Sequence, residues 1–219
     1  MSRQPPSPRI FVIPAAGADA AIVIRRGPAN WFHLLKWGMA KDTFEPGAWF
    51  RGSMYPEKCD LSPDGSLLLY FVLQGNKFKT SYSHAWTAVS RAPWLTALGL
   101  WPQGTTYGGG GRFVTNRHIL IRAGDASPHP DHPGKGLRVD LGNPEPHASS
   151  GEVKGATWSG RDRNGRLIYA KDGKIFRRSS KGKDKQLVDL AGLRPDPKPS
   201  PKWASQNIDA RPGRSRRDI

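Results

Sequence analysis

The sequence has a single cysteine, Cys59, among its 219 residues. One thiol excludes an intramolecular disulfide, so the fold is not a disulfide-stabilised scaffold, and this usage suits a reducing compartment. Because Cys59 lies in a strand-like segment with no evident histidine or asparagine partner, we expect a buried core residue and not a nucleophile. Long hydrophobic runs are also missing. The longest, such as Leu67–Leu73, have the length of a strand, whereas a membrane-spanning helix needs about 20 apolar residues.

A secretion signal is not evident either. The apolar stretch from Ile10 to Ile24 is interrupted by Pro14, Gly17 and Asp19, which makes a poor signal peptide. We therefore expect a cytoplasmic protein without a membrane span.

Acidic residues are scarce, with 18 Asp and Glu against 34 Lys and Arg, which gives a net charge of +16 and a pI near 10.4. No paired carboxylates, nucleophile elbow or Ser/His/Asp arrangement has a recognisable spacing. The sequence therefore predicts no catalytic residue and no cofactor, and it favours a binding protein over an enzyme.

Glycine and proline are abundant, with 25 and 20 residues, and they separate short β-like runs. A two-strand pattern recurs along the chain. In the first two copies the paired runs align without a gap, and in the third a longer loop joins them: Arg9–Ile13 with Ala21–Arg25, Lys174–Arg178 with Gln186–Leu190, and His118–Arg122 with Leu137–Leu141.

Similar glycine-led strands precede the second and third copies, which extends the repeat to a four-strand unit of about 40 residues. The clearest turn is Ser62-Pro63-Asp64-Gly65, followed by an apolar strand of the kind buried on both faces. About four units fit the chain, so we expect an all-β fold, a small or incomplete β-propeller-like array, with a β-sandwich or irregular β fold as the alternative.

The two ends of the chain suggest how such a ring would close. The first copy supplies only two strands of a unit, and Pro201–Ala204 resembles the start of another, so the ends would share one blade. Residues 31–55 fit the repeat badly.

Several segments of the chain resemble known protein families. Ser62-Pro63-Asp64-Gly65 with its strand resembles the turn of TolB and WD40 propeller repeats, without the Trp-Asp signature. A family of uncharacterised bacterial proteins is similar over roughly the N-terminal half of the chain. The similar segments are Pro46–Gly52, Cys59–Gly65, Trp86–Pro93, Leu98–Pro102 and Gly108–Gly111. The resemblance implies a β-propeller-like fold and brings no known activity with it.

The positive charge is concentrated near the C-terminus. Residues 151–219 hold 18 Lys and Arg against 8 Asp and Glu, a net charge of +10. We therefore expect three parts: a disordered arm (1–8), the β domain (9–204) and a basic flexible tail (205–219). The candidates for binding a polyanion lie in a hairpin tip and this tail: Arg177, Arg178, Lys181, Lys183, Lys185, Arg211, Arg214, Arg216 and Arg217.

Other candidates combine cationic and aromatic side chains that could hold a carboxylate, phosphate or sugar. These ligand-binding candidates are Trp49, Arg51, Trp86, Arg91, Trp101 and Tyr107. The three tryptophans among them would be the stacking faces for a sugar. The alternative is that arginine stacks on tryptophan at the edge of a blade.

Two motifs are interpreted as structural. His129-Pro130-Asp131-His132 has the residue types of a metal site, but its prolines favour an exposed loop, so no metal is predicted. Gly108–Gly111 lacks the lysine and the following helix of a phosphate loop, so we expect a close backbone approach there.

The leading hypothesis is a non-enzymatic, propeller-like protein that binds another macromolecule, with a protein as its partner, through its rim or central face. Binding of nucleic acid or another polyanion through the basic C-terminal third, and binding of a small ligand or sugar, are the alternatives. The oligomeric state stays open, since exposed strand edges can pair with a second chain.

Overall fold

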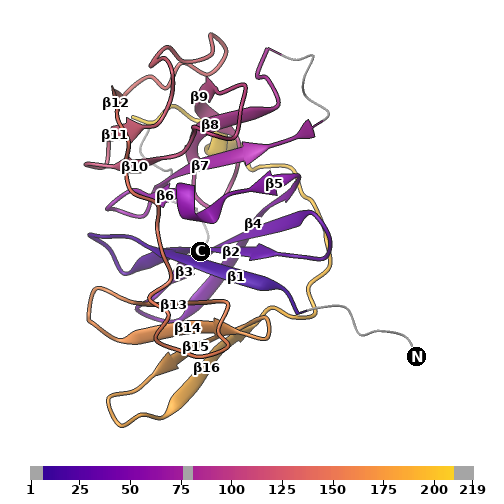
Figure 1. Ribbon diagram of the computed structural model, residues 1–219, viewed down its shortest axis with the longest axis vertical. Helices are drawn as coiled ribbons and strands as arrows, with labels where there is room; N and C mark the ends of the chain where they lie inside the picture. The colour runs from indigo at the N-terminus through magenta and orange to yellow at the C-terminus, as the bar shows by residue number, and fades with distance from the viewer. Residues whose placement is uncertain (1–6, 76–80, 210–219) are drawn as a thin grey trace, which may run out of the picture.

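The computed structural model describes residues 7–75 and 81–209, which form four β-sheets (Figure 1). The all-β class predicted from the sequence is confirmed. The helical turns with described bounds are short 3₁₀ segments, η1 (Pro56–Lys58) and η3 (Lys202–Ser205). Within the described ranges, no helix has the length and apolar character to cross a membrane.

The first half of the chain forms two sheets. Sheet A is antiparallel in chain order and contains β1 (Arg9–Pro14), β2 (Ala20–Arg26), β3 (Trp31–Gly38) and β4 (Thr43–Arg51). Sheet B contains β7 (Leu67–Leu73), β8 (Ala85–Arg91) and β9 (Ala97–Pro102), with two short strands, β5 (Ser53–Met54) and β6 (Asp60–Leu61), that share one edge of β7.

The second half forms two smaller sheets. Sheet C contains β10 (Gly111–Phe113), β11 (His118–Ile121) and β12 (Arg138–Leu141). Sheet D is antiparallel and contains β13 (Trp158–Arg161), β14 (Leu167–Lys171), β15 (Lys174–Arg178) and β16 (Asp184–Asp189).

The four sheets stack in the order C, B, A, D, from top to bottom of Figure 1. Three hydrophobic cores fill the spaces between neighbouring sheets. Sheets A and B meet around Ile24 and Leu68, sheets A and D around Trp37 and Ile168, and sheets B and C around Leu69 together with residues of β11. The last sheet in the sequence therefore packs against the first.

This order explains which strands are apolar throughout. Sheets A and B are covered on both faces, and β2 and β7 accordingly have consecutive buried residues, including Leu67–Val72. The strands of outer sheet C are covered on one face, and β11 alternates buried with half-buried residues. The turn predicted at Ser62–Gly65 is confirmed, with the Gly65 N–H donating to the Ser62 carbonyl (2.7 Å) and a φ of 71° at Gly65.

The expected sharing of one blade by the two chain ends is wrong. Strands β1 and β2 begin a complete sheet, because residues 31–51, which fitted the repeat badly, supply β3 and β4. Pro201–Ala204 lies in and beside η3 and does not begin a strand. None of the four sheets is closed.

The third copy of the two-strand pattern also differs from the other two. Strands β1 and β2 pair antiparallel, as do β15 and β16, but β11 and β12 pair parallel. A parallel neighbour requires a long crossover, and residues 122–137 supply it. The longer loop in the sequence was the sign of this change of direction.

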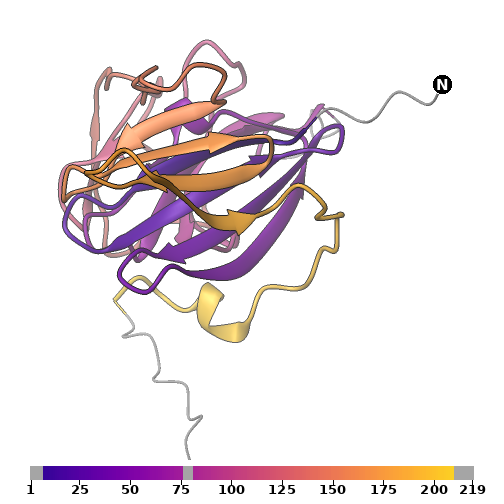
Figure 2. The same ribbon diagram turned by 90° about the horizontal axis from the view of Figure 1, so that it is seen from below.

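Two long segments run along the stack and connect distant sheets. One is the C-to-D connection, residues 142–157, which passes beside sheets A and B in Figure 1. In this segment the His147 N–H donates to the Glu57 carbonyl (2.7 Å), and His147 Nε2 lies 2.9 Å from Asp60 Oδ1. The other is the C-terminal strap, residues 190–209, drawn in yellow along one side of the molecule in Figure 2.

Buried arginines hold both ends of this strap. At its start, Arg25 on β2 donates from Nε to the Leu190 carbonyl (2.7 Å) and from Nη2 to the Leu193 carbonyl (2.9 Å). Near its end, Arg91 on β8 donates from Nη2 to the Asn207 carbonyl (2.6 Å). Sequence analysis placed the end of the β domain at residue 204, but the chain stays packed beyond it, because Ile208 is buried in the core between sheets B and C.

Candidate functional site

The six ligand-binding candidates lie in different parts of the molecule. Trp49 on β4 stacks on His33, with ring centroids 4.2 Å apart, and burial lowers the pKa of His33 to about 4, with Arg25 adding to the shift. Trp101 is buried between sheets B and C, and its Nε1–H donates to the Ala126 carbonyl (2.9 Å). Two of the three predicted aromatic stacking faces are therefore occupied by the protein itself.

The remaining four candidates are separate as well. Trp86 packs against the core between sheets A and B, whereas the side chain of Tyr107 is 90% exposed. Arg91 holds the C-terminal strap, and Arg51 lines a shallow cavity with Gln74 and other residues. The structure does not bring the six candidates together.

The basic hairpin tip is partly neutralised. Arg177 makes a bidentate pair with Asp42 (2.7 and 3.0 Å), and Arg178 makes one with Asp184 (2.8 and 3.0 Å). Lys185 also lies within 3.7 Å of Asp42. Lys181 and Lys183 are exposed, and Arg211, Arg214, Arg216 and Arg217 lie outside the described residues.

A salt titration of DNA binding tests this difference among the basic residues. We expect the double variant Lys181→Gln/Lys183→Gln to make the log–log salt slope shallower by about 2, since each exposed charge releases about one counterion. The matched double variant Arg177→Gln/Arg178→Gln should change the slope by less than half as much, because carboxylates already neutralise these groups. Equal slopes for the two variants would show that the pairs do not form in solution.

The glycine run Gly108–Gly111 is a close backbone approach, as predicted. The Gly109 N–H donates to the Arg122 carbonyl (2.7 Å), and the Gly110 N–H donates to Thr87 Oγ1 (2.8 Å). A Cβ on Gly109 would lie 2.1 Å from the ring of Phe71. These N–H groups are therefore not available to a phosphate.

The histidine loop is exposed at Pro130 and Asp131, as the prolines predicted, but its two histidines pack against the protein. His132 accepts from the Leu100 N–H through its carbonyl, and its Nδ1 lies 2.9 Å from the Ala97 carbonyl, so the loop lies along β9. His129 is buried beside Tyr82. In the described part of the chain, no group of three or more His, Cys, Asp or Glu residues is placed to hold a metal ion.

Cys59 and Asp60, which have nucleophile and acid–base chemistry, are also engaged. Cys59 is fully buried, and burial raises the pKa of its thiol to about 12, so the thiolate is absent at neutral pH. Asp60 accepts from the Phe113 N–H (2.7 Å) with one oxygen and contacts His147 with the other. The expectation that Cys59 is a core residue is confirmed.

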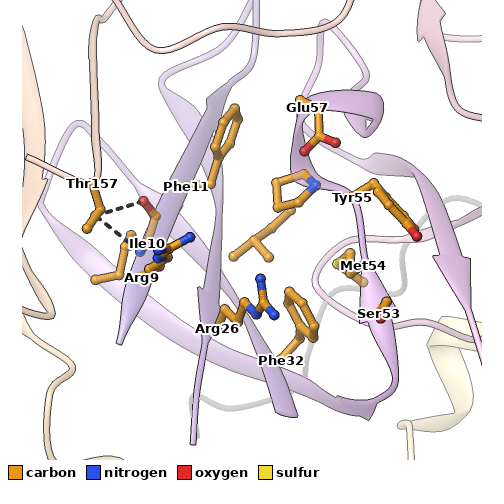
Figure 3. A pocket seen from close by; sticks show the side chains of 12 residues that line it. Arg9, Ile10, Phe11, Arg26, Phe32, Ser53, Met54, Tyr55, Glu57 and Thr157 are labelled. Carbon is orange, nitrogen blue, oxygen red and sulfur yellow. Dashed lines mark hydrogen bonds between the residues drawn. The ribbon is translucent and has the colours of Figure 1, made fainter. Parts of the chain in front are cut away.

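A cavity of about 470 Å³ lies between sheets A and B (Figure 3). We call it the A–B site. Its walls combine apolar side chains with two arginines and one glutamate. The lining residues are Arg9, Ile10, Phe11, Ile24, Arg26, Phe32, Ser53, Met54, Tyr55, Pro56, Glu57 and Thr157.

Strand alternation places the residues of the first wall. Side chains two positions apart on a strand share a face, so Arg9 and Phe11 on β1 point the same way, as do Ile24 and Arg26 on β2. Ile24 belongs to the core between sheets A and B, which identifies this face as the one toward sheet B. The hairpin therefore presents an arginine on each strand at its open end and apolar groups further in.

The two arginines form an unusual pair. Arg9 and Arg26 are directly opposite in the register of β1 and β2, and like charges in that position destabilise a sheet. Both side chains are exposed, and within the described residues neither has a carboxylate in ion-pair contact. The guanidinium of Arg26 lies 5.7 Å from the ring centre of Phe32, whose side chain is buried. This arrangement leaves two positive charges available at the mouth of an apolar cavity.

The second wall is an edge of sheet B. Residues 53–57, which include β5 and part of η1, line the site as one continuous segment. The Tyr55 N–H donates to the Phe71 carbonyl (3.1 Å), so the preceding pair, Met54 with Val72, is a non-hydrogen-bonded pair of the antiparallel ladder. The main-chain N–H and C=O of Met54 therefore point away from β7, toward the open edge of the sheet.

The third boundary comes from the C-to-D connection. Thr157 Oγ1 lies 3.4 Å from both the N and the O of Ile10 and donates to the Ala170 carbonyl (3.2 Å), which ties β1 to sheet D (Figure 3). Three elements far apart in the sequence thus build the site.

Such a site can hold an anionic group at its mouth and an apolar group inside. Comparison with family models, with curated proteins and with solved structures finds no match to this chain. The sequence patterns did not predict this site. One pattern in the sequence could have indicated it. Each strand of the first hairpin has an arginine at its outer end, two positions from an apolar residue and therefore on the same face.

Proposed function

We propose that the chain is a non-enzymatic, propeller-like binding protein that holds part of a protein partner in the A–B site. The observation that carries this proposal is the pair Arg9 and Arg26, placed opposite each other at the mouth of an apolar cavity without a carboxylate in ion-pair contact among the described residues. A pair of like charges has an unfavourable energy in the free protein. An anionic ligand group bound between the two arginines attracts both of them, so the electrostatic energy of the site becomes favourable.

The fold supports a binding role. Four sheets stacked face to face bring strands from the start of each sheet together, with β1 contacting β6, β13 and β14, and β6 contacting β10. This neighbourhood of first strands is the arrangement that surrounds the axis of a propeller, and the A–B site lies beside it. Rigid strands position a binding site better than loops do.

The other functions considered have less support from the geometry. Two of the three tryptophans proposed as sugar-stacking faces are covered, and two of the arginines proposed to contact a polyanion are paired with Asp42 and Asp184. Two groups suited to nucleophilic or acid–base chemistry, Cys59 and Asp60, are buried and engaged.

Selection from a displayed library of random peptides tests the proposal. We expect the protein to select peptides that carry a negative charge next to apolar residues. The double variant Arg9→Gln/Arg26→Gln should weaken their binding at least about tenfold, a loss of about 1.4 kcal/mol. The matched control Lys181→Gln/Lys183→Gln removes the same charge outside the site and should leave binding within about twofold.

Two results would contradict the proposal. One is binding that the Arg9→Gln/Arg26→Gln variant retains in full. The other is robust turnover on a broad hydrolase panel that is lost in Asp60→Asn, which would make the protein an enzyme.

A further inference from the structure

We infer that the A–B site recognises the C-terminal residue of an extended protein segment, with the terminal carboxylate between Arg9 and Arg26 and the last, apolar side chain in the cavity below them. This inference rests on the proposed function and adds the chemical identity of the ligand group.

The charge of the lining favours a single negative charge on the ligand. Arg9 and Arg26 contribute two positive charges, and Glu57 contributes one negative charge, so the site has a net charge of +1. One carboxylate neutralises that charge, whereas a phosphate near its second ionisation would exceed it. A carboxylate also has two oxygens in one plane, which suits two guanidinium groups that approach from neighbouring strands.

The depth of the site favours a residue whose carboxylate and side chain share one carbon atom. The charged groups of Arg9 and Arg26 are exposed, whereas Ile24, Phe32 and Met54 are 1%, 2% and 4% exposed. Same-face neighbours on a strand are about 7 Å apart, so the apolar floor begins within one such step of the arginines. A terminal residue reaches both with its α-carboxylate and its side chain. An internal aspartate or glutamate would place its side-chain carboxylate beside the arginines. A second residue would then have to supply the apolar side chain that contacts the floor of the cavity.

The edge of sheet B gives the rest of the segment a place to bind. Met54 lies on β5, which is an edge strand, and its main-chain N–H and C=O point away from β7, but the residue is only 4% exposed, so pairing there requires the groups that cover it to move aside. An extended segment can pair with such an edge through its own main chain, independently of its sequence. Main-chain pairing at Met54 would leave the end of the segment beside the arginines, because Met54 and the two arginines line the same cavity.

Fluorescence anisotropy with the full chain tests the inference directly. The probes are fluorescein-labelled glycine–serine peptides that end in valine, leucine, isoleucine or phenylalanine, each made with a free C-terminal carboxylate and as the C-terminal amide. A third series has the amide end and an internal glutamate two residues before the apolar residue, so its charge equals that of the free acid. Competition by 4-phenylbutyrate, a small apolar acid, tests whether a terminus is needed at all.

We expect the free-acid peptides to bind at least about tenfold more tightly than the amides and the internal-glutamate peptides. The double variant Arg9→Gln/Arg26→Gln should abolish this preference, and Lys181→Gln/Lys183→Gln should keep it, with both variants showing the thermal unfolding of the parent chain. Equal affinity for acid and amide, or for terminal and internal carboxylates, would overturn the inference and leave the proposed function intact. Competition by 4-phenylbutyrate as strong as that of the peptide would also overturn it, since the ligand would then be a small acid. Failure of every peptide in this assay and in the library selection would reject the proposed function itself.

Discussion

Replacement of Arg25 by methionine is expected to lower the free energy of unfolding by about 3 kcal/mol. Arg25 is 2% exposed, and its guanidinium donates to the carbonyls of Gly27, Leu190, Ala191 and Leu193. Burial lowers the pKa of this group, but an arginine stays protonated at neutral pH, so each of these hydrogen bonds is charge-assisted. Methionine has a similar length and leaves the buried carbonyls without a donor.

Urea unfolding and limited proteolysis measure the effect together. Loss of Arg25 should release the start of the C-terminal strap, so trypsin should cleave faster after Lys202. Arg194 and Lys198 precede Pro195 and Pro199, where trypsin does not cleave. The matched control is Arg26→Met, one residue along the same strand. Arg26 is exposed and faces Arg9, so its loss should change the stability by less than about 0.5 kcal/mol. Equal stabilities for the two variants would mean that Arg25 does not hold the strap.

The variant Gly109→Ala is expected to lose a similar amount of stability, about 3 kcal/mol, for a different reason. Gly109 has a φ of +79°, where an L-residue is strained by about 1 kcal/mol or more. Its new methyl group would lie 2.1 Å from the ring of Phe71, which is completely buried and cannot move away without repacking the strands around it. Overpacking of this kind costs about 1–3 kcal/mol.

The chain contains a glycine that separates these two contributions. Gly104 has a φ of +68°, and an added Cβ there would have no heavy atom within 4 Å. Urea unfolding of Gly104→Ala should therefore report the backbone strain alone, about 1 kcal/mol. If Gly109→Ala and Gly104→Ala lose the same stability, the contact with Phe71 is not a constraint.

Local patterns in the sequence were sufficient for the strands and turns. The apolar run of Leu67–Leu73 predicted a strand buried on both faces, because only an inner sheet of a stack can bury consecutive side chains. Proline and glycine in Ser62–Gly65 predicted the turn before it. What these patterns did not predict was the pairing of whole segments. The repeat placed β1 and β2 at the end of a unit, and the residues that complete their sheet, 31–51, do not resemble the repeat.

The candidate site was harder to predict because no local pattern defines it. Arg9 and Arg26 are 17 positions apart in the sequence and become neighbours only through the register of the first hairpin. Residues 53–57 face them because sheets A and B pack together, and Thr157 arrives from the C-to-D connection. Aromatic and cationic residues that are close in sequence, such as Trp49 and Arg51, do not line the A–B site, because Trp49 stacks on His33 and Arg51 lines a separate cavity.

The order of the stack also determines when each apolar face is covered during biosynthesis. Sheet A is made first, but one of its faces, which includes Val23 and Trp37, is covered only by sheet D, whose strands begin at Trp158. At translation rates of 5–20 residues per second, this face stays uncovered for on the order of 10 s. During that interval the nascent chain presents an apolar sheet surface to water or to a chaperone. Slower translation of residues 143–190 would therefore be expected to increase aggregation of the new chain without changing the stability of the finished protein.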